Sequence, residues 1–150
     1  MDANAVALLN GEIQQLHAEL EPTFFKTDAS HAEVVAFFAA KLSAPGHGIQ
    51  LAEIGGMPVG YVWFEVQDRP ETPFQFARKR IYIHHLSVKR AARRTGVGSA
   101  LLDAIQTAAM GAGITSIALD TWAANSHALR FFEAQGFTPF NLVLGKRLSD

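Results

Sequence analysis

At 150 residues the chain has the length of one ordinary globular domain, and its net charge of −1 gives no overall positive field to attract nucleic acid or an anionic membrane. The sequence contains no cysteine, which excludes disulfides, zinc–thiolate sites and a cysteine nucleophile. No apolar run reaches membrane-spanning length, and the start of the chain lacks a basic signal-like segment. We therefore expect one cytoplasmic domain over residues 1–150, with no metal, nucleic acid or membrane as a partner.

The first part of the chain predicts two helices. Apolar residues recur at three- and four-residue intervals over residues 6–20, and Pro22 ends this pattern. Ser30 and Glu33 have the spacing of a capping box, which begins a second helix that stops before Pro45. Each helix therefore has one apolar face to bury.

The middle of the chain predicts a sheet. Residues 49–54 and 59–67 are typical of two strands joined by a hairpin turn at residues 55–57. A loop over residues 68–79, which contains two prolines, leads to an apolar strand at residues 81–88. Further elements are expected after it: a helix over residues 99–110, a strand over 114–121, a helix over 126–135 and two strands within 137–148. The pattern predicts a mixed α/β fold.

The strand at residues 81–88 is followed by a basic loop and a helix, and this order predicts an anion site. The loop carries Arg93 and Arg94 and ends in Gly-Val-Gly at residues 96–98. N–H groups at a helix start lack partners within the helix, and the helix dipole adds positive charge there. Glycines let the backbone approach a bulky anion, and arginines suit phosphate oxygens. The pattern therefore favours a phosphate-bearing ligand.

This segment has two other interpretations. The glycines would merely shape a loop whose arginines are solvated, or the segment would be a dinucleotide-binding turn with Asp120 as its acidic residue. The second is disfavoured because Leu101 occupies the third glycine position and the loop over residues 89–96 is too long for the tight turn required.

Two motifs make the sequence resemble the GNAT superfamily of N-acetyltransferases. VKRAARRTGVG at residues 88–98 resembles the family's acetyl-CoA pyrophosphate motif, Arg/Gln-x-x-Gly-x-Gly/Ala. NSHALRFFEAQGF at residues 125–137 resembles its helix N-x-x-A-x-x-F-Y-E-x-x-G-F. The resemblance extends over about residues 9–148. It implies the GNAT fold, an α/β architecture with a central, mostly antiparallel twisted sheet that is splayed at the acetyl-CoA site and covered by helices on both faces.

The resemblance also implies transfer of acetyl from acetyl-CoA to an amine that attacks the thioester directly. A small-molecule primary amine is the expected acceptor. Acetyl-CoA would be held by residues of the third strand, the basic loop and the last helix: Leu86, Ser87, Val88, Arg93, Arg94, Thr95, Gly96, Val97, Gly98, Ser99, Asn125, Ala128, Phe131 and Phe132.

His84 is the candidate general base, because some family members carry a histidine at this place and an imidazole titrates near neutrality. Strict alternation along the strand puts His84 on the same face as Tyr82 and Leu86, and His85 on the opposite face with a structural role. A histidine satisfied by hydrogen bonds within the sheet is the alternative for His84.

Phe132 departs from the family, where a tyrosine is thought to protonate the leaving thiolate. Three explanations stay open: water or another hydroxyl donates the proton, Tyr82 substitutes, or the protein binds acyl-CoA with little turnover. The alternatives to the expected function are accordingly a catalytically weak acyl-CoA-binding or protein-interaction module and a protein lysine or N-terminal acetyltransferase.

The acceptor side is less well defined by the sequence. Phe25 and Tyr82 are expected to contact the acceptor. Several carboxylates would attract a cationic amine there unless they are ordinary surface groups: Glu21, Glu65, Asp68, Glu71 and Asp120. The family usually begins with a strand that this sequence lacks, so a bare sheet edge and a homodimer that covers it are expected.

Overall fold

The computed structural model describes residues 2–149, which form two compact units, one ending at Asp120 and one beginning at Thr121. The first unit holds α1 (Ala3–Leu20), α2 (His31–Ser43), β1 (His47–Ile54), β2 (Met57–Arg69), β3 (Arg78–Val88), the 3-10 turn η1 (Arg90–Ala92), α3 (Val97–Gly111) and β4 (Ile117–Leu119). The second unit holds α4 (Ser126–Ala134). The mixed α/β pattern predicted from the sequence is confirmed.

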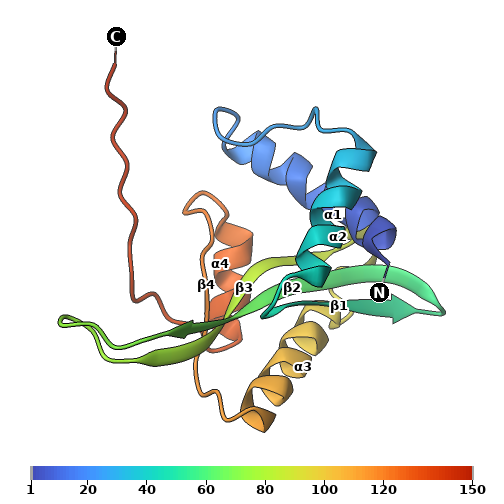
Figure 1. Cartoon of the computed structure of the whole chain (residues 1–150). Coiled ribbons are helices and arrows are strands. Elements are labelled where there is room, and N and C mark those ends of the chain that lie inside the picture. Colours follow the sequence, from blue (N-terminus) through green and yellow to red (C-terminus); the bar gives the residue numbers. More distant parts are fainter. Residues whose placement is uncertain (1, 150) are drawn as a thin grey trace. The chain divides into compact units, whose positions relative to one another are not determined.

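The sheet of the described residues has the order β1-β2-β3-β4. Its first three strands are antiparallel, and β4 pairs in parallel with β3 from Ile81↔Ile117 to Ile83↔Leu119. α1 and α2 cover one face of this sheet and α3 covers the other, as Figure 1 shows. Among residues 2–149 no strand precedes α1, so β1 is an edge strand with no neighbour on its outer side.

The capping box predicted for α2 is present. The Ser30 hydroxyl accepts the N–H of Glu33, and the Glu33 carboxylate accepts the N–H of Ser30 at 2.6 Å. These two bonds satisfy donors that a helix start otherwise leaves to water.

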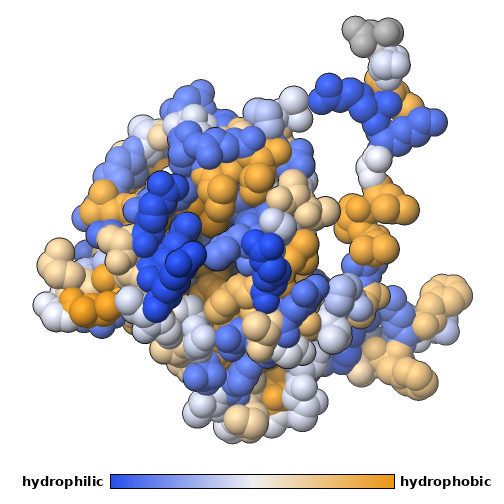
Figure 2. Space-filling view, turned by 180° about the vertical axis from the view of Figure 1, so that it is seen from behind, coloured by the Kyte–Doolittle hydropathy of each residue, from blue (hydrophilic) through white to orange (hydrophobic). Residues whose placement is uncertain are grey.

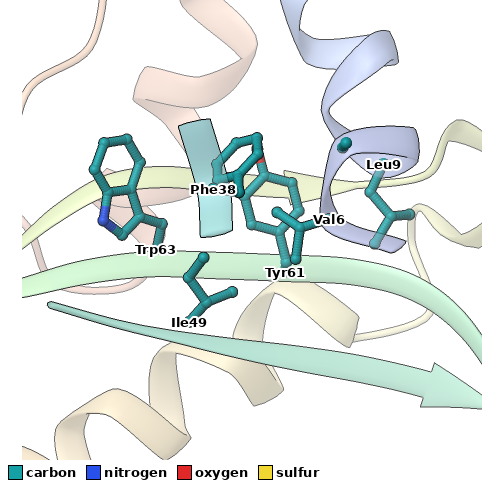
Figure 3. Close-up of a cluster of buried hydrophobic side chains, with 7 residues drawn as sticks. Val6, Leu9, Phe38, Ile49, Tyr61 and Trp63 are labelled. Carbon is teal, nitrogen blue, oxygen red and sulfur yellow. The ribbon is translucent and has the colours of Figure 1, made fainter. Parts of the chain in front are cut away.

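A cluster of aromatic and aliphatic side chains joins α1 and α2 to the sheet. Phe38 of α2 is 1% exposed and meets Tyr61 and Trp63 of β2 edge-to-face, with ring centroids 5.8 and 6.1 Å apart. Val6 and Leu9 of α1 pack against the same rings (Figure 3). Edge-to-face contacts of this kind stabilise a core by more than the buried area of the rings alone. The opposite face of the sheet is covered by α3 through its buried residues Val97, Leu101, Leu102, Ile105 and Ala109.

A β-bulge in β3 overturns the alternation expected there. Trp63 pairs with His85 and Phe64 with Ile83, so His84 is an extra residue between two ladder positions. The rings of His84 and His85 both contact Trp63, at centroid distances of 4.3 and 4.9 Å. The two histidines therefore share the face covered by α1 and α2, and the prediction that His85 lies opposite His84 was wrong.

The sheet opens beyond the bulge. The β3–β4 pairing ends at Ile83, whereas β3 continues to Val88 with only β2 as its paired neighbour. Leu86, Ser87 and Val88 therefore lie on a stretch of β3 that has no strand partner on its β4 side within the described chain. This is the splayed sheet that the resemblance implied.

The last strands were predicted incorrectly. Only residues 117–119 of the expected strand at 114–121 join the sheet, and no helix or strand forms over residues 137–149. Apolar side chains there are exposed, Val143 to 95%, and Figure 2 shows hydrophobic and hydrophilic stretches following each other along this segment. Apolar alternation makes a strand only where another strand completes the ladder, and the sequence does not show whether one does. Across residues 2–149, none of the helices combines the length and apolar character needed to cross a membrane.

Candidate active site

A carboxylate between two histidines forms the centre of the site on the α1/α2 face. Glu65 of β2 lies with Oε2 2.8 Å from Nε2 of His84 in β3 and with Oε1 3.9 Å from Nε2 of His47 in β1. All three side chains are partly buried. The hydrogen bond from His84 lowers the pKa of the Glu65 carboxyl, which favours its ionised form.

Trp63 holds this cluster together. Its ring stacks on His84 with the planes 21° apart, and its indole N–H donates to Nδ1 of His47 at 3.1 Å. The edge of Tyr82 meets His84 on another side, at 5.0 Å. We define Trp63, His47, Glu65 and His84 as the histidine–carboxylate cluster.

The histidine–carboxylate cluster has the composition of a metal site. One ligand atom from each of His47, Glu65 and His84 lies within 4.8 Å of the others. Two imidazoles and a carboxylate would suit a transition metal. Sequence spacing did not reveal this grouping, because its members come from three different strands.

Tyr82 and Asp120 add a second carboxylate beside the cluster. The Tyr82 hydroxyl donates to Oδ2 of Asp120, which follows β4. Burial, and then the charge and hydrogen bond of Asp120, raise the pKa of Tyr82 to about 12, so the phenol stays protonated at neutral pH. Tyr82 also pairs across the strands with Glu65. The carboxylates of Glu65 and Asp120 thus flank the Tyr82–His84 face.

His85 belongs to a buried chain of hydrogen bonds rather than to the histidine–carboxylate cluster. Asn10 of α1 donates to the Tyr61 hydroxyl at 3.1 Å, and that hydroxyl lies 3.0 Å from Nδ1 of His85. Burial first, and then the charges of His17 and His84, lower the pKa of His85 to about 4. A neutral imidazole therefore serves as acceptor here, which agrees with the structural role expected for His85.

The predicted anion cradle begins with a strained loop. Arg94 has φ +63° and Gly96 has φ +83°, and such left-handed backbone is unfavourable for most residues. A Cβ built on Gly96 meets no atom within 4 Å, so this point of the loop faces open space. The arginines at 93 and 94 are exposed, and within the described chain neither forms an ion pair.

α3 begins directly after Gly96. The first bond of the helix runs from Ala100 N–H to the Gly96 carbonyl, which leaves the N–H groups of Val97 and Gly98 without acceptors inside the helix. The Thr95 hydroxyl donates to the Ala92 carbonyl, so its hydrogen is already used within the loop. Ser99 lies in the same first turn. Dipole, open N–H groups and two guanidinium groups together fit the diphosphate of a coenzyme A ester.

A groove of about 410 Å³ runs between α1 and the basic loop. The backbone N–H of Arg90 donates to the Glu12 carboxylate at 2.8 Å, which fixes the loop to the helix. The groove is lined by Gly11, Glu12, Gln15, Leu16, Glu19, Arg90 and Arg93.

Phe25 lies in the connector between α1 and α2. It follows α1 and stacks on His17, with centroids 4.9 Å apart. Burial lowers the pKa of His17. Phe25 therefore packs against α1 through His17, and its predicted contact with the acceptor stays a prediction.

The second unit carries the remaining predicted residues. Asn125 is the N-cap of α4, and its Oδ1 accepts the N–H of Ala128 at 3.1 Å. Phe132 meets Phe131 and Phe137 edge-on, at centroid distances of 5.3 and 5.6 Å. The helix ends in a Schellman motif, in which Phe137 N–H reaches the Phe132 carbonyl and Gly136 has φ +92°. Residues of the family's helix motif therefore set the ends of α4: Asn125 caps its start and Gly136 ends it.

Comparisons with known proteins identify the class. The sequence profile described as the acetyltransferase (GNAT) family matches residues 13–137. The chain is 30% identical over 107 residues to the aminoglycoside N(6')-acetyltransferase type 1 of Klebsiella aerogenes, an alignment that covers 71% of this chain and 69% of that enzyme.

Solved structures agree on the fold. A tetramutant of the BH1408 protein from Bacillus halodurans superposes with a TM-score of 0.90 at 20% identity, covering 98% of this chain and 94% of that one. The aminoglycoside N-acetyltransferase AAC(6')-Iy, solved in complex with CoA, gives a TM-score of 0.68 at 19% identity over 93% of this chain and 88% of that one.

The chain belongs to the acetyltransferase (GNAT) family and has its fold. It is accordingly an acyltransferase of a family that typically uses acetyl-CoA. The predicted family, fold class and enzyme class are confirmed.

Proposed function

We propose that this protein transfers acetyl from acetyl-CoA to a small-molecule primary amine, with His84 as general base. The observation that carries the proposal is the position of His84, 2.8 Å from the Glu65 carboxylate and in ring contact with Tyr82, whose hydroxyl donates to a second carboxylate, Asp120. Carboxylates attract a cationic amine, and an imidazole then removes its proton before attack. The relative from Klebsiella aerogenes is an aminoglycoside acetyltransferase, which supports an amine of this kind.

In the proposed reaction, the amine nitrogen attacks the thioester carbonyl. A C–N bond forms, the C–S bond breaks, and the proton of the ammonium group passes to His84, directly or through water. The nitrogen loses its second proton to water as the amide forms, and water in turn gives a proton to the leaving CoA thiolate, because Phe132 cannot donate one and the Tyr82 hydroxyl is engaged by Asp120. Holding both reactants side by side supplies much of the rate.

The donor is assigned to the cradle and to the open stretch of β3. Arg93, Arg94 and the start of α3 would hold the diphosphate, and residues 86–88 would bind the pantetheine arm through their backbone. Thr95, Gly96, Val97, Gly98 and Ser99 complete the cradle. We assign Asn125, Ala128, Phe131 and Phe132 to the same ligand on the strength of their match to the family's helix motif.

The test is thiol release from acetyl-CoA with a panel of amines, followed by a thiol-reactive dye. The protein has no cysteine and contributes no background signal. Release with one amine class is expected, and His84→Gln should lower kcat by about 100-fold or more while acetyl-CoA affinity, measured by calorimetry, stays within twofold. Unchanged turnover in His84→Gln would remove this residue from the mechanism.

A second function is favoured by Phe132. A protein that binds acyl-CoA without efficient turnover would show calorimetric binding of acetyl-CoA and no thiol release with any amine, and Phe132→Tyr would then raise activity. Absence of acetyl-CoA binding would contradict both functions.

We also propose that residues 1–150 act as one domain and that the protein is a homodimer. The bare outer side of β1 and the exposed apolar side chains between residues 140 and 148 support a second copy as partner. Sedimentation velocity would give the mass of one chain if this is wrong.

A further inference from the structure

We infer that Glu65 is a positioning residue: it holds His84 as the tautomer protonated at Nε2, so that Nδ1 presents the lone pair that takes the acceptor's proton. The catalytic part of this inference rests on the proposed function, which makes His84 the base. The tautomer itself does not depend on that function and is measured separately.

The Glu65–His84 hydrogen bond can run in one direction only. An ionised carboxylate has no proton and can only accept. The atom 2.8 Å from its Oε2 is Nε2 of His84, which must therefore carry the hydrogen. In the neutral imidazole the other nitrogen, Nδ1, is then unprotonated. A glutamate–histidine pair of this kind sets the tautomer in the same way as the acid of a catalytic triad.

The other polar groups near Glu65 are also nitrogen donors. The indole N–H of Trp63 is a donor only, so Nδ1 of His47 accepts it and the hydrogen of His47 sits on Nε2. That Nε2 lies 3.9 Å from Oε1 of Glu65. The side-chain nitrogen of Gln67 lies 3.4 Å from Oε2. Donors thus converge on Glu65 from β1, β2 and β3, and they keep its carboxylate in place.

The His84 ring has little freedom to turn. Trp63 stacks beneath it at 4.3 Å, Tyr82 meets it at 67°, and the His47 ring is stacked at 5.7 Å. The β-bulge at His84 places its side chain against the Trp63 ring. With Nε2 directed at Glu65, a 180° turn of the ring would put Cε1 in the place of Nε2 and lose the hydrogen bond.

The same donor arrangement speaks against a metal ion on the cluster. A metal bound by His47, Glu65 and His84 through the atoms that converge needs a lone pair on Nε2 of each histidine. Here each Nε2 carries a proton, and the Trp63 N–H blocks the shift of the His47 proton to Nδ1. A histidine that binds a metal usually donates its other ring N–H to an acceptor, whereas Nδ1 of His47 here receives a hydrogen bond from Trp63.

Imidazole ¹H–¹⁵N correlation spectra at neutral pH test the tautomer without any acceptor. His84 and His47 are expected to show the Nε2–H form. In Glu65→Ala the His84 signals should move to a mixture of tautomers, and Glu65→Gln, whose amide oxygen still accepts, should restore the Nε2–H form. Glu53→Ala removes an exposed carboxylate of β1 and should change nothing. An Nδ1–H form of His84, or no change in Glu65→Ala, would overturn the inference. So would tight zinc binding that displaces both Nε2 signals.

Kinetics test whether Glu65 acts through His84. Glu65→Ala should lower kcat about tenfold or more with the KM for acetyl-CoA unchanged, and the double variant with His84→Gln should be no slower than His84→Gln alone. Additive losses in the double variant would mean that Glu65 acts independently of His84, which contradicts the positioning role. If His84→Gln keeps full activity while the tautomer behaves as expected, the base assignment fails and the tautomer assignment stands.

Discussion

Acidification should destabilise this protein through His85. Its imidazole is buried and neutral, with Nδ1 accepting the Tyr61 hydroxyl, and its pKa falls from 6.5 to about 4 on folding. A protonated ring would present a second donor to Tyr61, which already receives the Asn10 amide. The unfolded chain therefore binds the proton more readily than the folded one.

The sign and size follow from this pKa difference. A depressed folded-state pKa gives stability that is present above pH 6.5 and is lost as the pH falls toward 4. Between pH 7.5 and 5.0 the loss in the free energy of unfolding is about 2 kcal/mol, out of about 3 kcal/mol for complete protonation.

Urea unfolding followed by circular dichroism at both pH values gives the measurement. Other groups also titrate in this range, so the quantity to compare is the pH-dependent change in wild type and in His85→Gln, whose amide can still accept the Tyr61 hydroxyl. On acidification the free energy of unfolding of His85→Gln should fall by about 2 kcal/mol less than that of wild type. His127→Gln, at an exposed histidine of α4, should behave like wild type. Equal losses in wild type and His85→Gln would refute the reasoning.

Two further substitutions test the backbone around the proposed donor site. Gly60→Ala should lower the free energy of unfolding by about 1–3 kcal/mol, because its Cβ would lie 2.8 Å from the Ser87 carbonyl oxygen, a backbone atom. In Gly48→Ala the Cβ would lie 2.5 Å from the end of the Phe64 ring, and a side chain can turn aside more readily than backbone, so we expect a smaller loss. Urea unfolding of both variants checks this, and equal losses would contradict it. Gly96→Val should abolish acetyl-CoA binding in calorimetry. Gly113→Val is the control, because Gly113 has φ +71° and equally open surroundings at the other end of α3. This variant should lower the free energy of unfolding by a similar amount, about 1–2 kcal/mol, and should bind acetyl-CoA normally. Equal affinities of Gly96→Val and Gly113→Val for acetyl-CoA would contradict the assignment of the loop at Gly96 as the diphosphate site.

The sequence was informative wherever function or capping depends on residues close together in the chain. The capping box at Ser30, the basic loop with Gly96 and the helix beginning after Asn125 are all of this local kind, and the resemblance to the GNAT family rested on two of them. Their chemistry is fixed by spacing within one segment, so the sequence alone carries it.

What the sequence did not reveal depends on pairing between strands. His47 and Trp63 gave no signal, because β1 and β2 join them to His84 only once the sheet has its register. The bulge was missed for the same reason, since an extra residue is visible only against its partner strand. The exposed apolar run after Phe137 shows the limit most plainly, because alternation alone does not supply a hydrogen-bonding neighbour.

The bulge also has an evolutionary consequence. Removing position 84 would let Ile83 and His85 become consecutive partners of Phe64 and Trp63, so the ladder would close into a regular one. A single-codon deletion would therefore leave the scaffold intact and erase the proposed base. The converse insertion, in an ancestor with an unbroken strand, would have placed a new imidazole against the Trp63 ring without altering any side chain that packs the core. Chemistry at this position can be gained or lost by changing the length of the strand, independently of the residues that hold the sheet together.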